Sequence, residues 1–176
     1  MLEVFNTLAN NHKNDSLANT LRRKRFRLFN DFIDSLPKPL KIIDVGGTQL
    51  FWEQMNFLPG KDVEITILNL NKPATDKPGF TGIQADATDM SQIPDNHYDV
   101  AFSNSVIEHV GGIEEQQKMA GEMQRIAKNI FMQTPNRSFK NGVHCHKIQN
   151  AQTMNTSSMM KSLQRLCSTG CYTGAR

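Results

Sequence analysis

The chain has 176 residues, of which 38% are hydrophobic and 7% aromatic, and its formal net charge is +3. This length fits one domain, and the small charge excess does not by itself indicate a nucleic-acid partner. No apolar run reaches the roughly eighteen residues that a membrane-spanning helix needs. The N-terminus does not read as a secretory signal and the cysteine count is odd, so we expect a cytoplasmic protein with reduced thiols.

The first predicted element is an amphipathic helix over Ser16–Leu36. Ser16 is a suitable N-cap, and Pro37 prevents the helix from continuing. The apolar side chains that recur at helical spacing are Leu17, Leu21, Leu28, Phe29, Phe32, Ile33 and Leu36. We therefore expect this stripe to pack on the core of the domain.

The segment that organises the rest of the chain follows at once. Lys41–Val45 is a short apolar run and predicts a buried parallel strand. Gly46 and Gly47 allow a sharp turn and a close approach of a ligand, and a helix is predicted over Leu50–Phe57. A strand, a glycine turn and a helix in this order place backbone N–H groups around a polar ligand at the carboxyl edge of a sheet.

Further strands alternate with loops and one longer helix, which predicts a parallel sheet with crossover connections. The predicted strands are Glu64–Leu70, Thr81–Ala85, Tyr98–Ser103 and Asn129–Thr134, and the helix spans Ile113–Lys128. The fold class is therefore α/β, with a Rossmann-like, doubly wound and mostly parallel sheet of about five strands.

Two motifs carry a family resemblance. The run IDVGGT, which contains Asp44, resembles the first motif of class I S-adenosylmethionine (SAM)-dependent methyltransferases, although its two glycines are adjacent. The run DNHYDVAFSNSVIEHV resembles the fourth-strand motif of the methyltransferase type 11 group. The resemblance covers about residues 16–139 and implies SAM as the cofactor.

The resemblance also implies the roles of individual residues, all at the carboxyl edge of the sheet. The implied cofactor-binding residues are Asp44, Gly46, Gly47, Asn69, Asp86, Ala87, Ser103 and Asn104. Asn69 stands where the family usually has a ribose-binding acid, and an amide can accept one such bond. Asp86 is implied to accept from the adenine amine, and capping of the short turn that follows it is an equal alternative.

Glu108 and His109 form the acid–histidine pair of the second motif. His109 is a candidate catalytic base for an oxygen nucleophile, and packing at the mouth of the pocket is the alternative. Related metal-dependent enzymes carry a further glutamate three residues before the pair, where this chain has Ser105. Two ligands make a poor divalent site, so we predict no metal. The segment His144-Cys145-His146 lacks typical zinc spacing.

The composition changes after the last predicted strand. All 17 acidic residues lie at or before Glu122, and no strand-like apolar run is found from Lys140 onward. We therefore divide the chain into a methyltransferase domain, 1–139, and an irregular or disordered basic tail, 140–176. The two final strands that the resemblance implies are expected to be missing, as in a truncated or altered C-terminus, and a disordered extension or a change of reading frame would each explain this.

These observations predict a SAM-dependent methyltransferase with a small-molecule acceptor, and neither a membrane nor a nucleic acid as partner. The alternative is a non-catalytic nucleotide-binding module or a truncated methyltransferase remnant. An NAD enzyme is disfavoured, because the glycine spacing differs and the second strand ends in Asn69 where NAD binders place an acid.

Overall fold

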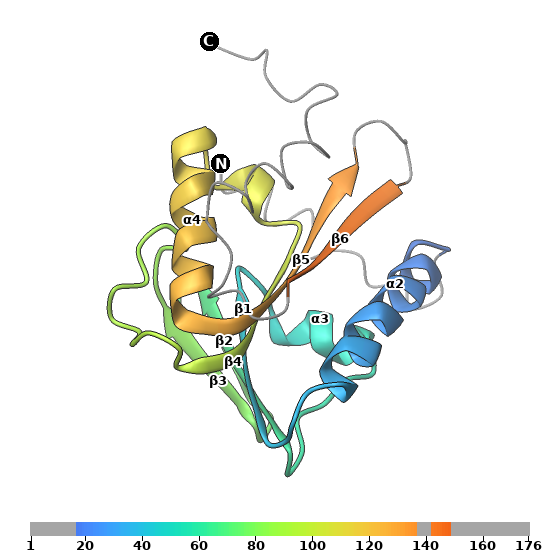
Figure 1. Ribbon diagram of the computed structural model, residues 1–176. Coiled ribbons are helices and arrows are strands. Elements are labelled where there is room, and N and C mark those ends of the chain that lie inside the picture. The colour runs from blue at the N-terminus through green and yellow to red at the C-terminus, as the bar shows by residue number, and fades with distance from the viewer. Residues whose placement is uncertain (1–16, 137–141, 149–176) are drawn as a thin grey trace.

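A computed structural model of the chain describes residues 17–136 and 142–148. The strands are β1 (Leu40–Val45), β2 (Val63–Asn69), β3 (Phe80–Gln84), β4 (Tyr98–Asn104), β5 (Ala127–Asn136) and β6 (Gly142–Ile148). The helices are α2 (Leu17–Asp34), α3 (Gln49–Gln54) and α4 (Ile113–Ile126), with a short 3-10 helix, η1 (Ile107–His109). Helix α4 covers one face of the sheet, and α2 and α3 cover the other (Figure 1).

The sheet has the order β3-β2-β1-β4-β5-β6, and its first five strands are parallel. The Rossmann-like α/β fold predicted from the sequence is therefore confirmed. Strand β1 is central, since Asp44 pairs with Ile67 of β2 and with Phe102 of β4. The strand order reverses between β1 and β4, and in such sheets ligands bind outside the carboxyl ends at this point.

Strand β6 corrects one expectation, because the sequence predicted no strand after residue 139. Residues 142–148 pair antiparallel with β5, in a register that sets His144 opposite Thr134 (Figure 1). An antiparallel edge strand needs only backbone pairing with one neighbour and does not have to be apolar on both faces, so its sequence lacks the run typical of buried parallel strands. Residues 149–176, with Cys167 and Cys171, lie outside the described residues.

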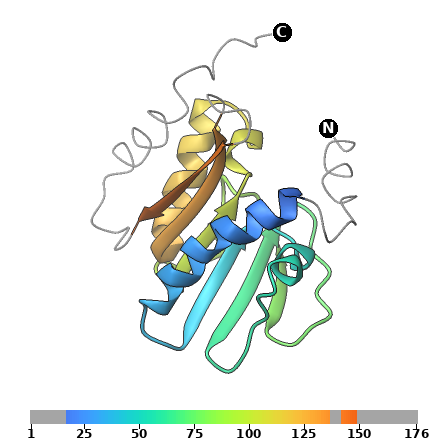
Figure 2. The ribbon, with the colours of Figure 1, turned by 90° about the vertical axis from the view of Figure 1, so that its right-hand side faces the viewer.

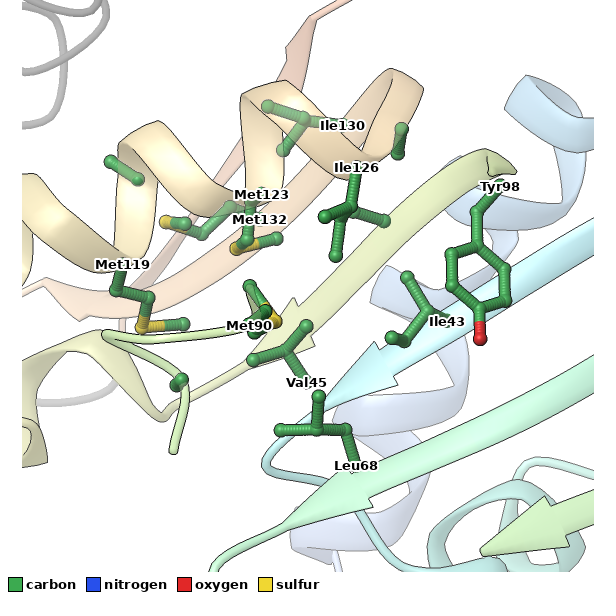
Figure 3. Packing of buried hydrophobic residues seen from close by; sticks show 14 of the residues in the cluster. Ile43, Val45, Leu68, Met90, Tyr98, Met119, Met123, Ile126, Ile130 and Met132 are labelled. Atoms are coloured by element: carbon green, nitrogen blue, oxygen red, sulfur yellow. The ribbon is translucent and has the colours of Figure 1, made fainter. Parts of the chain in front are cut away.

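The core beneath α4 is aliphatic and rich in methionine. Met119 and Met123 of α4 point toward the sheet, where Met90 and Met132 meet them (Figure 3). All four side chains are buried to 1% exposure or less. Flexible thioether side chains fill irregular space between a helix and a twisted sheet.

The opposite core is aromatic and lies under α2, which runs across the sheet (Figure 2). Phe29 is central, with its ring centroid 4.8 Å from that of Phe102 and 5.2 Å from that of Phe131. Leu28 was predicted to point inward and is instead 54% exposed, while Phe26 is buried. The helical stripe therefore passes through Phe26, Phe29 and Ile33, because the larger rings fill the space over β4 and β5. Ser16, the predicted N-cap, lies outside the described residues.

Candidate active site at the carboxyl edge of the sheet

Buried polar side chains mark one edge of the sheet. Five polar residues are buried in the described part of the chain, and four of them lie near the carboxyl ends of β1, β4 and β5. These four are Asp44, Ser103, Gln133 and Thr134. Burial of polar groups costs free energy unless they are hydrogen-bonded, so their concentration at one edge indicates a functional region.

The glycine turn after β1 is held tightly from two sides. Gly46 has a φ of +83° and donates its N–H to the carbonyl oxygen of Leu68 at 2.7 Å. A Cβ atom at Gly46 would lie 2.6 Å from the methyl groups of Val106. Thr48 then caps α3, accepting from the N–H of Phe51 at 3.4 Å. Only glycine satisfies both the backbone angle and the contact, so Val106 packs directly on the turn.

Gly47 lies directly on the carboxyl group of Asp44. A Cβ atom at Gly47 would be only 1.7 Å from Oδ2 of Asp44. That same oxygen accepts a 2.7 Å hydrogen bond from Nε1 of Trp52, on α3. The other oxygen, Oδ1, is buried and has no hydrogen-bond partner among the described residues. Asp44 therefore supports the turn from beneath.

Burial changes the ionisation of Asp44. The side chain is 1% exposed, and this desolvation raises the pKa of Asp44 to about 7, although the Trp52 hydrogen bond opposes the shift. The sequence identified Asp44 as a site residue but did not predict Trp52 as its partner. A buried carboxyl group with a raised pKa beneath a glycine turn is typical of functional sites.

Asn69 reaches the same turn from the end of β2. Its side-chain Nδ2 donates to the carbonyl oxygen of Gly47 at 3.3 Å, and its Oδ1 accepts from the N–H of Leu70 at 2.9 Å. The structure thus brings Asn69 to the glycine turn, while its contact with a ribose stays a prediction. Its amide also stabilises the turn itself.

Asp86 follows β3 and caps the turn that comes next. Its Oδ1 accepts from both the N–H and the hydroxyl of Thr88, each at 2.8 Å. The capping interpretation is therefore observed, while contact of Asp86 with an adenine amine stays a prediction. Ala87 is buried against the α4 side of the core. A shallow hollow in the described surface lies between Thr88 and α4, away from the glycine turn.

Arg125 is a supporting residue that the sequence analysis missed. Its guanidinium donates to the carbonyl oxygens of Ile93 and Met90, at 2.7 and 2.9 Å, and binds Glu122 and Asp95, each at 2.8 Å. These bonds fix the segment after β3 against α4. A lone arginine near the end of a helix gives no signal of such long-range contacts in the sequence.

The segment after β4 crosses the glycine turn. Ser103 donates its hydroxyl to the carbonyl oxygen of Val45 at 3.1 Å, which joins the ends of β4 and β1. Ser105 has a φ of +57° and donates its N–H to the carbonyl oxygen of Gln133 at 2.8 Å. Asn104 is half-buried beside them. The predicted residues Ser103 and Asn104 therefore lie at the same edge as Gly46 and Asp44.

The acid–histidine pair divides between interior and surface. Glu108 is half-buried, with Oε2 at 3.4 Å from the hydroxyl of Thr134, and burial raises the pKa of Glu108. His109 is exposed. No cluster of three metal-ligating side chains occurs in residues 17–136, and the absence of a bound metal stays a prediction. None of the helices described here is long and apolar enough to cross a membrane.

Comparison with known proteins gives a family match and a fold. Residues 48–129 match the model of a methyltransferase domain family, and no curated protein matches the chain. A protein from Anabaena variabilis ATCC 29413, described as a methyltransferase from an antibiotic biosynthesis pathway, superposes with a TM-score of 0.54 at 18% identity. That superposition covers 81% of this chain and 61% of the other.

A second solved structure, the CurJ carbon methyltransferase, superposes with a TM-score of 0.53 at 13% identity. It covers 68% of this chain and 36% of CurJ. The chain thus spans less than two thirds of either structure, and at these identities both show the fold alone. The predicted resemblance to class I methyltransferases of the type 11 group is confirmed, and it is carried by the family match over residues 48–129.

Proposed function

We propose that this protein is a SAM-dependent methyltransferase that acts on a small-molecule acceptor. The observation that carries the proposal is the glycine turn at the crossover between β1 and β4. There, two residues without side chains adjoin a cluster of buried polar groups. The family match over residues 48–129 supports the same chemistry.

The residues present fit the cofactor. Gly46 and Gly47 form a turn in which any Cβ atom would collide with Val106 or Asp44, so its backbone carries no side chains, and Asn69 stands at its side. Asp86 uses one carboxyl oxygen for Thr88, and no described hydrogen bond occupies the other. SAM would lie along this edge, with its methionine and ribose at the glycine turn and its adenine toward Asp86.

Bound SAM supplies an activated methyl group on a sulfonium centre. The protein then has to position the acceptor in line with that group and to exclude water. Because the leaving group is already good, this positioning provides most of the rate enhancement. Ser103 and Asn104, at the end of β4, are proposed to lie under the sulfonium. The sequence proposed His109 as the general base, and it is exposed on η1, next to the half-buried carboxyl group of Glu108.

A non-catalytic nucleotide-binding module is the second candidate. The family match over residues 48–129 is equally compatible with this candidate. Such a module would bind SAM and transfer no methyl group. Binding and turnover therefore have to be measured separately.

Isothermal titration of the purified chain with SAM, with its demethylated product and with NAD tests the proposal. We expect one saturable site for SAM and its product, and none for NAD. Gly46→Val should abolish binding, because its side chain would collide with Val106. Gly60→Ala is the matched control, since a Cβ there meets no atom within 4 Å. Binding of NAD alone, or unchanged SAM binding by a folded Gly46→Val protein, would refute the assignment.

A further inference from the structure

The segment after β4 contains one carboxyl group, that of Glu108 in η1. Val106, two residues earlier, packs against the glycine turn at Gly46. Glu108 itself extends toward the end of β5, where it meets Thr134. The carboxyl group therefore lies near the carboxyl end of β5, two residues along the chain from the Val106 side chain that packs on the turn.

This carboxyl group lacks the partners that buried carboxyl groups normally have. Its Oε1 is buried and accepts no hydrogen bond within the described residues, while the carboxyl group as a whole is bonded only to its own backbone N–H and to the hydroxyl of Thr134, 3.4 Å from Oε2. None of the ion pairs found in residues 17–136 includes Glu108. A buried acceptor without a donor costs about 1–3 kcal/mol, and a donor on a bound ligand would remove that cost.

The backbone that leads to Glu108 is strained. Ser105 has a φ of +57°, in the left-handed region that non-glycine residues rarely adopt. It is held there by the 2.8 Å hydrogen bond to the carbonyl oxygen of Gln133. Such strain persists where the surrounding structure requires it, and it is concentrated at functional sites. The strained turn directs the chain from β4 into η1 and so sets the position of Glu108.

We propose that Glu108 accepts a hydrogen bond from the acceptor's nucleophile, which is a hydroxyl or an amine, and takes its proton during methyl transfer. This inference rests on the proposed methyltransferase function. The nucleophile's lone pair forms the new bond to the methyl carbon, and the electrons of the broken carbon–sulfur bond stay on sulfur. The proton released by the nucleophile passes to the Glu108 carboxylate, so the step balances without a further reactant.

Two features suit Glu108 to this role better than His109. Desolvation raises the pKa of the Glu108 carboxyl, which makes the carboxylate a stronger proton acceptor. The hydroxyl of Thr134, itself 3% exposed, donates to Oε2, and Oε1 is the carboxyl oxygen that has no donor among the described residues. His109 is exposed, so water competes for its ring. Acceptors that release no proton on methylation, such as carboxylates, gain nothing from this arrangement.

Ligand binding tests the hydrogen bond without requiring turnover. The full chain, saturated with the demethylated product, is titrated by NMR with phenol beside anisole, and with benzylamine beside ethylbenzene. The first compound of each pair has a hydroxyl or amine hydrogen-bond donor, and the second lacks it. We expect at least one donor to bind about tenfold or more tightly than its counterpart, and Glu108→Gln to remove that preference. Glu114→Gln, at an exposed position on α4, is the control that should keep it.

Transfer from methyl-labelled SAM to the same probes tests the proton step. Glu108→Gln should lower the rate about 100-fold or more, while its affinity for SAM stays within about twofold of the parent. Equal transfer by Glu108→Gln and the parent, or loss in His109→Gln alone, would overturn the proposal. So would the absence of any donor preference or transfer in a protein that binds SAM. Failure to bind SAM at all would instead refute the proposed function.

Discussion

Replacing Asp44 by Asn should change how the stability of the protein depends on pH. The folded-state pKa of Asp44 is about 7, against an ordinary value of 3.8, because its carboxyl group is buried. The folded protein therefore holds a proton on Asp44 that the unfolded chain loses between about pH 4 and pH 7. Over that window this residue makes the protein less stable as the pH rises.

The size of the effect follows from the pKa difference. Each unit corresponds to about 1.4 kcal/mol, so the ionisation of Asp44 costs about 4 kcal/mol of unfolding free energy by pH 8. Asn keeps the shape and can accept from Nε1 of Trp52, but it cannot ionise. Its buried amide N–H groups add a cost of about 1–3 kcal/mol that does not vary with pH. The unfolding free energy of Asp44→Asn minus that of the parent should therefore increase by about 4 kcal/mol between pH 4 and pH 8.

Urea unfolding followed by circular dichroism at several pH values measures this difference. Other titrating groups are common to both proteins and cancel. Asp89→Asn is the control. Hydrogen bonds from Ser91 lower the pKa of Asp89, so removing this carboxyl group should change the pH dependence of stability in the opposite direction. Parallel pH profiles for the parent and Asp44→Asn would show that Asp44 ionises normally in the folded protein, and would refute the reasoning.

Three further predictions concern the same edge of the sheet. Gly47→Ala should destabilise the protein by more than about 1 kcal/mol, since its Cβ would lie 1.7 Å from Asp44. Urea unfolding measures this, and a neutral effect would contradict the geometry. Asp86→Ala should weaken SAM binding by about 1–3 kcal/mol in calorimetry. If Asp86→Ala lowers stability but leaves the affinity for SAM unchanged, Asp86 serves only to cap the turn at Thr88. Elemental analysis after gentle purification should find less than about one equivalent of metal, and stoichiometric zinc or magnesium bound by Glu108 would contradict this.

The central sheet could be predicted from the sequence because buried parallel strands are short apolar runs. Tyr98–Ser103 and Asn129–Thr134 were predicted within the observed β4 and β5, and only their ends moved. Strand β6 could not be predicted, because an edge strand is held by backbone hydrogen bonds to one neighbour and does not require a run of apolar residues. Leu28 was misassigned because a helical stripe does not tell which of its borders faces the core.

The sequence located the glycine turn but did not predict the side-chain contacts around it. The order of strand and glycines identified Gly46 and Gly47, whose conformation is a local property. The bond between Trp52 and Asp44 depends on how α3 packs on β1, and the contact of Glu108 with Thr134 depends on the pairing of β4 and β5. Packing and pairing are long-range properties, so neither contact has a signature in the sequence.

The central position of β1 determines which piece of this protein can be produced and studied. The family match begins at residue 48, after β1 has ended. A fragment cut to the matched residues would lack the strand that joins β2 to β4, and the aromatic rings of Trp52 and Phe102 would lose their cover from Phe29 on α2. A fragment that is to fold independently should therefore begin no later than the start of α2.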